Sequence, residues 1–227
     1  MNNKLNHIAL ILDGNKRWAK KNNLPNIQGY SKGFENIINL VNYCLSLKLQ
    51  NLTIFTLSSE NYNRSSINLI YKIIYENFSK MFDELVNERD VKLKIFGERQ
   101  NLPRKIEEIF EKSESLSRQN KSLNLNIAFN YGFKNEIKNI IEKIKNKKIN
   151  INLENDQEFN QLFFLGSQPD PDILIRTGGH KRLSNFIMYH LTYTELFFSD
   201  TLWPDFSEKE LRLIINQFSK IDRKYGL

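Results

Sequence analysis

The 227-residue sequence has one cysteine, Cys44, and only three histidines, which are scattered along the chain. A single cysteine allows no disulfide within the chain, which favours a reducing compartment, and Cys44 itself is expected to be a small core residue. The histidines lack the spacing of zinc ligands. No apolar run approaches the roughly 20 residues that span a bilayer. Because the first apolar run ends at Asp13 without a signal-peptide cleavage site, we expect a cytoplasmic protein, either free or peripheral at the inner face of the membrane.

Several common catalytic and nucleotide-binding motifs are also missing. The chain has no Gly-x4-Gly-Lys-Ser/Thr loop and no Gly-x-Gly-x-x-Gly turn, so the usual phosphate-loop and dinucleotide fingerprints are excluded. It has no Gly-x-Ser-x-Gly nucleophile elbow. Glycine and proline are scarce, with 9 and 5 residues, so low-complexity segments do not dominate.

The charge balance is basic, with 33 Lys and Arg residues against 26 Asp and Glu residues and a formal net charge of +7. This balance fits an anionic partner, such as a nucleic acid, an acidic membrane surface or a phosphorylated small molecule, and it also fits plain solubility. A nucleic-acid-binding surface needs a continuous basic stripe with exposed aromatic residues. Here the lysines are dispersed and the arginines stand near carboxylates and glycines in turns, so we expect no nucleic-acid partner.

Short apolar runs alternate with longer amphipathic segments, a pattern typical of crossover units in a mainly parallel sheet. The expected strands are His7–Leu12, Leu52–Leu57, Val91–Phe96, Leu123–Phe129, Asp172–Ile175 and Glu195–Phe198. The expected helices are Ser31–Leu47, Ile67–Asn87, Pro103–Ser117, Lys134–Lys145, Gln157–Phe164 and Glu208–Ser219. We interpret the Lys- and Asn-rich stretch Lys143–Asp156 as a surface connection, so residues 1–227 are predicted to form a single α/β domain.

Polar turns follow four of the expected strands: DGNKRWA, SSENYNR, NYG and RTGGHKRLSN. Each alone fits an ordinary loop, but the carboxyl ends of parallel strands meet at one edge of a sheet, where ligands bind. The turns carry four arginines, Arg17, Arg64, Arg176 and Arg182, whose forks match phosphate oxygens, and glycines that let backbone N–H groups approach an anion. Asp13 and Glu195 add carboxylates beside these cations. The residues therefore indicate a Mg²⁺-assisted diphosphate site.

The expected helix Ile67–Asn87 has a broad apolar face, formed by Ile67, Leu69, Ile70, Ile73, Ile74, Phe78, Met81, Phe82 and Leu85. Such a stripe most often packs into a core. It also fits one wall of an elongated apolar cavity. The stripe alone does not separate the two interpretations.

Five blocks of the sequence, HIALILDGNKRWA, FTLSSENYNR, LNIAFNYG, DILIRTGGHKRLSNF and YTELFFSDTLWPDF, resemble the motifs of the cis-prenyltransferases, in particular the bacterial undecaprenyl diphosphate synthases. The blocks stand in the family's order and at family-like spacing, and the resemblance extends from His7 to Gly226. The Asp-Asp-x-x-Asp motifs of the trans-prenyltransferases are absent.

The resemblance implies a six-stranded, mainly parallel sheet flanked by helices that enclose an apolar tunnel, and a homodimeric enzyme. The implied reaction is a Mg²⁺-dependent condensation of farnesyl diphosphate with successive isopentenyl diphosphates, in which each new double bond is cis. The long product, undecaprenyl diphosphate as carrier lipid for cell-wall glycan, implies transient peripheral contact with a membrane. Product length depends on the tunnel, for which Thr56 and the Ile67–Asn87 helix are candidate determinants.

The resemblance also assigns roles to individual residues. Asp13 is the expected catalytic carboxylate and binds Mg²⁺, with Glu195 as a second metal ligand. Asn61 is expected to help remove the proton from isopentenyl diphosphate or to position that substrate. The expected substrate-binding residues are Gly14, Asn15, Lys16, Arg17, Trp18, Ser58, Ser59, Glu60, Tyr62, Arg64, Arg176, Arg182, Leu183 and Ser184. Within this set, Trp18 is expected to line the prenyl entrance.

Some positions depart from the bacterial pattern. Lys16 stands where the family usually has glycine, and Asn26 and Tyr30 stand where an arginine and a histidine usually contact the allylic diphosphate. Lys224 replaces a C-terminal arginine. One alternative function is a synthase of shorter or other product length. Another is a non-catalytic partner subunit, but such relatives usually lose the aspartate of Asp-Gly-Asn and the phosphate-binding arginines, which this chain keeps.

Overall fold

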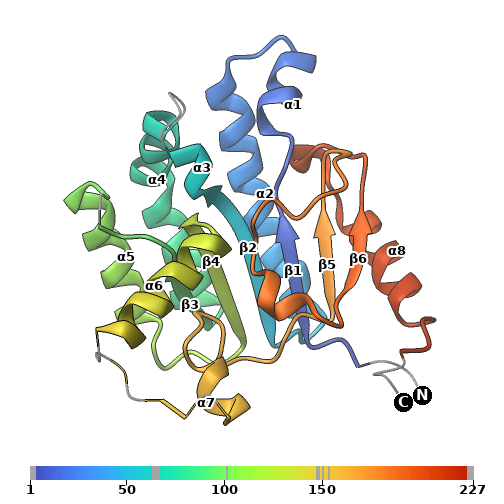
Figure 1. Ribbon diagram of the computed structural model, residues 1–227. Coiled ribbons are helices and arrows are strands. Elements are labelled where there is room, and N and C mark those ends of the chain that lie inside the picture. Colours follow the sequence, from blue (N-terminus) through green and yellow to red (C-terminus); the bar gives the residue numbers. More distant parts are fainter. Residues whose placement is uncertain are drawn as a thin grey trace.

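The computed structural model describes residues 4–62, 67–100, 102–146, 149, 151–152 and 154–223, without the side chains of residues 77–83. One sheet contains β1 (His7–Ile11), β2 (Asn51–Ser58), β3 (Val91–Phe96), β4 (Leu123–Tyr131), β5 (Ile173–Arg176) and β6 (Glu195–Phe198). The strands lie side by side in the order β3-β4-β2-β1-β5-β6, and each neighbouring pair is parallel. All six carboxyl ends therefore meet at one edge, the upper edge in Figure 1. The predicted sheet is confirmed, with strand ends within two residues of their expected positions.

The central strands are buried on both faces, as parallel strands with covering helices should be. Every residue of β1 and β5 is buried. Side chains alternate along β1, so Ile8 and Leu10 enter one hydrophobic core and Ala9 and Ile11 enter the other. The two cores lie on opposite faces of the sheet.

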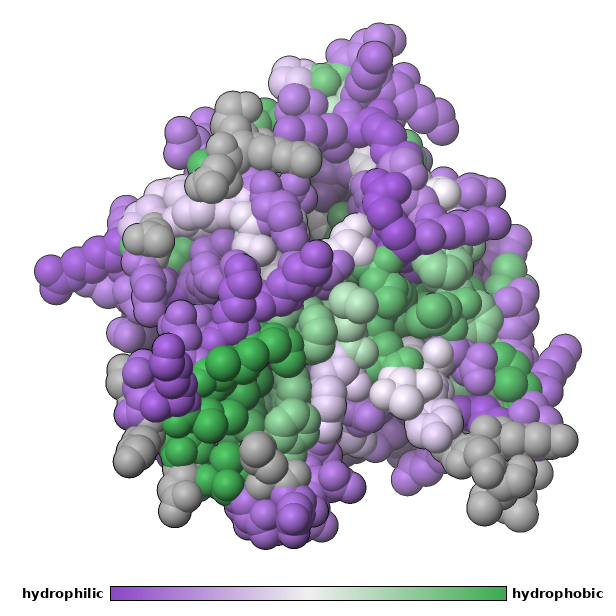
Figure 2. Space-filling model, in the orientation of Figure 1, coloured by the Kyte–Doolittle hydropathy of each residue, from purple (hydrophilic) through white to green (hydrophobic). Residues whose placement is uncertain are grey.

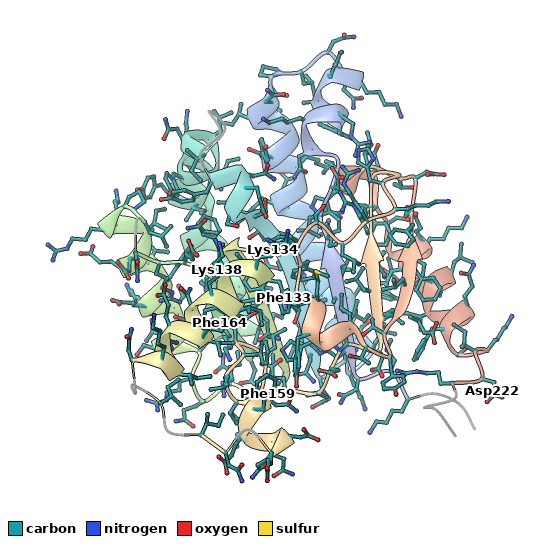
Figure 3. The ribbon with its side chains drawn as sticks, viewed as in Figure 1. Phe133, Lys134, Lys138, Phe159, Phe164 and Asp222 are labelled. Atoms are coloured by element: carbon teal, nitrogen blue, oxygen red, sulfur yellow. The ribbon has the colours of Figure 1, made fainter. Side chains whose placement is uncertain are left out.

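Helices cover both faces. The larger core packs against α2 (Asn26–Ser46), α4 (Ile67–Phe82), α5 (Arg104–Leu116) and α8 (Glu208–Phe218). On the other face lie α6 (Phe133–Lys145), α7 (Asp156–Asn160) and the 3-10 turn η2 (Met188–Leu191), as Figure 1 shows. Phe133, Phe159 and Phe164 lie on this second face in Figure 3. Among the described helices, none has both the length and the apolar character needed to cross a bilayer.

Helix α2 begins at Asn26, five residues before its expected start at Ser31. Glycine weakens a helical pattern, and Gly29 and Gly33 occupy its first turns for a packing reason. A Cβ added at Gly29 would lie 2.2 Å from the backbone oxygen of Asn15, and one at Gly33 would lie 2.2 Å from the Asn15 Oδ1 atom. The two glycines therefore let α2 lie directly against the start of α1 (Asn15–Lys21).

Two other helix predictions need correction, and two short helices were not predicted. The expected helix Ile67–Asn87 is α4 followed by a π-helical turn, η1 (Asp83–Glu88). The expected helix Gln157–Phe164 is wrong beyond Asn160, where α7 ends and where Phe163 instead stacks on Tyr189 at a ring distance of 4.0 Å. The list of expected helices lacks α1 and the short α3 (Ser59–Tyr62), although Ser-Ser-Glu-Asn is a sequence that can start a helix.

Candidate active site

The turn between β1 and α1 presents Asp13 at the carboxyl edge of the sheet. Its backbone N–H donates to the Thr177 hydroxyl at 3.0 Å, and that hydroxyl donates to the Asp13 carbonyl oxygen at 2.9 Å. The Trp203 backbone N–H donates to the same carbonyl oxygen at 3.0 Å. These bonds fix the backbone at Asp13, so its carboxylate stands in a defined place at the end of β1.

Two arginines contact the Asp13 carboxylate. Arg17 NH2 lies 3.1 Å from Oδ1, and Arg176 NH2 lies 2.9 Å from Oδ2. The Arg176 side chain is only 5% exposed, whereas that of Arg17 is 45% exposed. Burying a guanidinium is costly unless an anion accompanies it. One carboxylate beside two guanidinium groups leaves a net positive charge, which can attract a phosphate group.

Arg176 also organises the loop that follows β5. Its NH1 atom donates to the backbone oxygen of Arg182 at 2.5 Å and to the Ser184 hydroxyl at 2.6 Å. Its Nε atom is buried and has no hydrogen-bond partner within the described part of the chain. The predicted residues Arg176, Arg182 and Ser184 are thus brought together beside Asp13.

Two polar hollows lie on either side of Asp13 and Asn61, which line both. The first, the β5-side hollow, is also lined by Ser58, Glu60, Arg176, His180, Arg182, Ser184 and Asn185. The second, the α1-side hollow, is also lined by Gly14, Asn15, Lys16, Arg17, Tyr30 and Ile70. Predicted residues of three of the four turns therefore line two neighbouring polar hollows rather than one, and the NYG turn is absent from the described lining of both.

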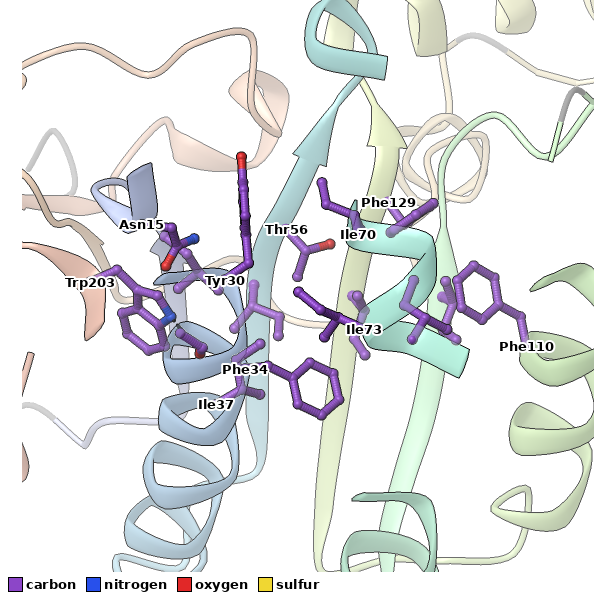
Figure 4. A pocket seen from close by; sticks show the side chains of 16 residues that line it. Asn15, Tyr30, Phe34, Ile37, Thr56, Ile70, Ile73, Phe110, Phe129 and Trp203 are labelled. Atoms are coloured by element: carbon purple, nitrogen blue, oxygen red, sulfur yellow. Dashed lines mark hydrogen bonds between the residues drawn. The ribbon is translucent and has the colours of Figure 1, made fainter. Parts of the chain in front are cut away.

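The α1-side hollow opens onto an apolar cavity, with which it shares Leu12, Asn15, Tyr30, Thr56 and Ile70. The cavity lies between α2, α4, α5 and the sheet and contains about 750 Å³ of empty space including its opening. Figure 4 shows its lining, which consists of Leu12, Asn15, Tyr30, Gly33, Phe34, Ile37, Ile54, Thr56, Ile70, Ile73, Ile74, Ile95, Phe110, Ile127, Phe129 and Trp203. The interpretation of the α4 stripe as a cavity wall is confirmed for Ile70, Ile73 and Ile74.

The expectation that Glu195 lies beside Asp13 is wrong within the described chain. Glu195 is the first residue of β6 and lies level with Ile173 of β5 and Ile8 of β1. From Ile8, β1 continues for three more residues to Ile11, about 10 Å at about 3.3 Å per residue, before the turn that carries Asp13. Glu195 is therefore near the amino edge of the sheet, at the end opposite the two hollows.

Other predicted residues have different surroundings from those expected. The Trp18 indole donates to Asp205 at 2.6 Å, and Trp18 is absent from the described cavity lining, where Trp203 is the tryptophan instead. Leu183 packs against the second core. The Tyr62 hydroxyl accepts from the Tyr71 hydroxyl at 3.1 Å.

The remaining predicted residues lie at or beyond the edge of the site. The Ser59 hydroxyl is 3.4 Å from Glu60 Oε2 and is absent from the described lining of the two hollows. Asn26 is the first residue of α2, and neither lining includes it. Arg64 and Lys224 lie outside the described residues.

Thr177, Trp203 and Asn185 are among the residues of the site that the sequence motifs did not single out. Thr177 fixes the backbone of Asp13, Trp203 lines the cavity, and Asn185 lines the β5-side hollow. Thr177 and Asn185 directly follow predicted residues, Arg176 and Ser184, and could have been found as neighbours in the same turn. Trp203 comes from a distant segment, and only the packing of η3 (Trp203–Asp205) against α2 places it there.

The arrangement suits two anionic groups held side by side, one of which carries an apolar tail. Arginines, glycine-bearing turns and a shared carboxylate provide for the anions, and the cavity provides for the tail. The fold and the site therefore fit the class of enzymes that act on anionic ligands with apolar tails.

Residues 11–226 match the family model described as "Putative undecaprenyl diphosphate synthase". The chain is 37% identical to the isoprenyl transferase of Aquifex aeolicus, over 97% of this chain and 95% of that protein. It is 36% identical to the ditrans,polycis-undecaprenyl-diphosphate synthase ((2E,6E)-farnesyl-diphosphate specific) of Legionella pneumophila strain Paris, over 100% of this chain and 98% of that protein. The chain belongs to the undecaprenyl diphosphate synthase family and is an enzyme of the cis-prenyltransferase class.

A solved structure shares the fold. Lavandulyl diphosphate synthase from Lavandula x intermedia, determined in complex with dimethylallyl diphosphate, matches with a TM-score of 0.89 and 28% sequence identity, over 98% of each chain. The six-stranded parallel sheet with flanking helices is therefore the fold of this enzyme class, as the sequence motifs predicted.

Proposed function

We propose that the protein condenses farnesyl diphosphate with successive isopentenyl diphosphates, with Mg²⁺, to make a long-chain cis-polyprenyl diphosphate, namely undecaprenyl diphosphate for cell-wall glycan synthesis. The observation that carries this proposal is that two polar hollows share Asp13 and Asn61 while the α1-side hollow opens into an apolar cavity. The farnesyl-diphosphate-specific name of the Legionella relative supports the choice of primer.

The allylic diphosphate is proposed to occupy the α1-side hollow, with its prenyl tail in the cavity. Gly14, Asn15 and Lys16 lie at or near the start of α1, and Arg17 lies in its first turn. Backbone N–H groups there and the two cationic side chains would hold the phosphate oxygens. The tail would pass Tyr30 and Thr56 into the apolar cavity, so the reacting carbon would lie at the boundary between the two environments.

Isopentenyl diphosphate is proposed to occupy the β5-side hollow, held by Arg176, Arg182 and Ser184. A new bond forms between its terminal alkene carbon and the first carbon of the allylic substrate. The allylic C–O bond breaks, the diphosphate leaves with the bonding pair, and a proton is lost from the new chain. Cationic groups and N–H groups fixed in advance stabilise the negative charge that develops on the leaving diphosphate.

Asn61 is proposed to position isopentenyl diphosphate, because it lines both hollows. Its backbone N–H donates to the Ser58 hydroxyl at 3.2 Å, which fixes the start of α3. An amide is a poor base, so a phosphate oxygen or a water molecule would take the proton. The side chain would orient the substrate for that transfer.

Mg²⁺ is commonly held by one or two carboxylates together with substrate phosphates. The described residues contain no cluster of three or more His, Cys, Asp or Glu side chains that could form an all-protein metal cage. Asp13 lines both hollows, so it fits a cation shared with phosphate oxygens, and Asp13 is the residue that would hold it. A bound Mg²⁺ would neutralise charge on the departing diphosphate.

A homodimer is proposed on the basis of exposed apolar residues near the β6 edge of the sheet. Met188, Tyr193 and Leu196 are 46%, 56% and 44% exposed, and Figure 2 shows apolar side chains gathered over this region. An exposed apolar edge strand invites a partner. We further propose that the enzyme works in the cytoplasm and touches the membrane transiently when it releases its apolar product.

The test is incorporation of radiolabelled isopentenyl diphosphate with farnesyl diphosphate and Mg²⁺, with product length resolved, in the wild type and in Asp13→Ala. Long butanol-extractable products from the wild type, absent in the variant, would support the proposal. No incorporation by a folded wild-type protein would overturn the proposed autonomous synthase and favour the partner-subunit alternative.

A further inference from the structure

Asn185 stands in a strained part of the loop that follows β5. Its backbone φ is 63°, and that of the preceding Ser184 is 51°. The left-handed region is unfavourable for residues other than glycine, although asparagine tolerates it best. Two such residues in succession, next to a binding site, need neighbouring contacts that hold them.

The Asn185 side chain provides those contacts by bridging two elements. Its Nδ2 atom donates to Glu60 Oε1 of α3 at 2.7 Å, and its Oδ1 atom accepts from the Lys134 backbone N–H of α6 at 2.9 Å. Its backbone oxygen accepts from the Phe133 N–H at 2.8 Å. Figure 3 shows Phe133 and Lys134 at the beginning of α6. One amide thus donates to a carboxylate and accepts from a backbone donor, which neither a carboxylate nor an apolar side chain can do.

The side chain of Asn185 is closely packed between α3 and the start of α6. A Cβ added at Gly132 would lie 2.8 Å from Asn185 Nδ2 and 2.5 Å from the Ser59 hydroxyl. The absence of a side chain at residue 132 therefore allows α3 and the β5 loop to approach each other closely. Burial acts to raise the pKa of the Glu60 carboxyl, but hydrogen bonds from Asn185 and from its own loop lower it below its ordinary value, so this acceptor is ionised at neutral pH.

The bridge continues into the centre of the site. Ser184, the neighbour of Asn185, accepts from Arg176, and Arg176 in turn contacts Asp13. At the other end, Glu60 directly precedes Asn61. A continuous set of contacts therefore joins Asn61 on one side of the β5-side hollow to Arg176 and Asp13 on the other.

We propose that Asn185 is a positioning residue that holds α3, and with it Asn61, against the β5 loop, so that the isopentenyl diphosphate site is assembled as one unit. This inference rests on the proposed function. It predicts that loss of the bridge slows the condensation step more than it weakens binding of isopentenyl diphosphate, because Arg176 and Arg182 keep their own places.

The test exchanges donor and acceptor across the bridge. Asn185→Asp keeps the shape and the acceptor for Lys134 but places a second carboxylate against Glu60, and kcat is expected to fall about 100-fold. Adding Glu60→Gln restores a donor, because the amide introduced on α3 can donate to the carboxylate introduced in the β5 loop. The kcat of the double variant is expected to be at least tenfold higher than that of Asn185→Asp. Glu60→Gln alone completes the double-mutant cycle, which measures the coupling between residues 60 and 185. Asn139→Asp, an exposed change on α6, is the matched control and is expected to leave kcat unchanged.

A rescue of kcat by the double variant, at similar KM for isopentenyl diphosphate and similar Tm, supports the inference. Wild-type kcat in Asn185→Asp, or a double variant no better than Asn185→Asp, overturns it. Hydrogen exchange of residues 59–62 gives a second readout that needs no turnover: exchange should rise in Asn185→Asp and fall again in the double variant. If the wild type shows no incorporation, the proposed function fails while the exchange measurement still decides whether Asn185 holds α3.

Discussion

At the carboxyl edge of the sheet Asp13 contacts Arg17 and Arg176, and at the amino edge Asp172 contacts Arg223 at 3.0 Å. Asp172 also accepts two backbone hydrogen bonds, from Asn6 at 2.7 Å and from His7 at 3.0 Å.

The two carboxylates differ in how they are held. Within the described part of the chain, the Asp13 carboxylate accepts hydrogen bonds from arginine side chains alone, and that side chain is 27% exposed against 16% for Asp172. Side-chain partners can move when a ligand arrives, whereas backbone donors at a strand end cannot. An Asp–Arg ion pair at the carboxyl edge is therefore suited to ligand exchange, whereas the one at the amino edge fixes chain ends.

The largest expected effect is on Asp13. Asp13→Asn keeps the shape but removes the charge that Arg17 and Arg176 share, and kcat is expected to fall by about 10³-fold, since preorganised charge contributes effects of that order. Steady-state incorporation of isopentenyl diphosphate measures it. A variant with a tenfold loss or less would contradict the proposed role.

The matching change at the other edge should affect stability rather than catalysis. Asp172→Ala leaves Arg223 without this carboxylate and two backbone N–H groups without their acceptor, so the free energy of unfolding is expected to fall by about 3 kcal/mol. Urea denaturation measures the loss, and kcat below the new Tm should stay within twofold of wild type. A large loss of kcat in the folded variant would show that the two edges are not separate.

His7, at the amino edge, predicts a pH dependence of stability. Burial lowers its pKa from 6.5 to about 4, while its ring contacts Pro169 O and the Thr53 hydroxyl, each at 2.7 Å. Below pH 6.5, His7 binds a proton in the unfolded chain but stays neutral in the folded chain. The free energy of unfolding therefore falls as the pH drops from about 6.5 toward 4. The expected loss at pH 5 is about 2 kcal/mol.

Thermal unfolding of the wild type and of His7→Gln between pH 7 and pH 5 measures this contribution. The variant starts from a lower Tm because it loses a buried contact, but its slope with pH should be shallower. Equal slopes in the two proteins would assign the pH dependence to other groups.

A substitution in the cavity is expected to have the smallest effect on rate, but it should change the length of the product. Ile70 lines the cavity where it meets the α1-side hollow, so Ile70→Phe narrows the path of the tail and is expected to shorten the products by one or more five-carbon units. Overpacking should cost about 1–3 kcal/mol of stability. Leu213→Phe, at a 55% exposed position on α8, is the control, and thin-layer separation of the products is the measurement. Unchanged product length would contradict the proposal that the prenyl tail occupies the cavity.

The sequence allowed the carboxyl edge to be predicted because parallel strands bring their ends together. Arg17 and Arg176 come from turns 159 residues apart, and both contact Asp13. The same reasoning could have corrected Glu195, because a residue that begins a strand belongs at the amino edge. Other features depend on packing between distant segments. Trp203 rather than Trp18 lines the cavity because η3 packs on α2, and the start of α2 at Asn26 depends on Gly29 and Gly33 fitting against Asn15.

The most direct test of the two-hollow site is a structure of the enzyme with isopentenyl diphosphate, Mg²⁺ and a non-hydrolysable thio-analogue of farnesyl diphosphate. We expect the analogue's phosphates in the α1-side hollow near Arg17, its tail against Ile70 and Phe34, and isopentenyl diphosphate at Arg176 in the β5-side hollow. Phosphates of both ligands in a single hollow, or a tail lying outside the cavity, would contradict this expectation.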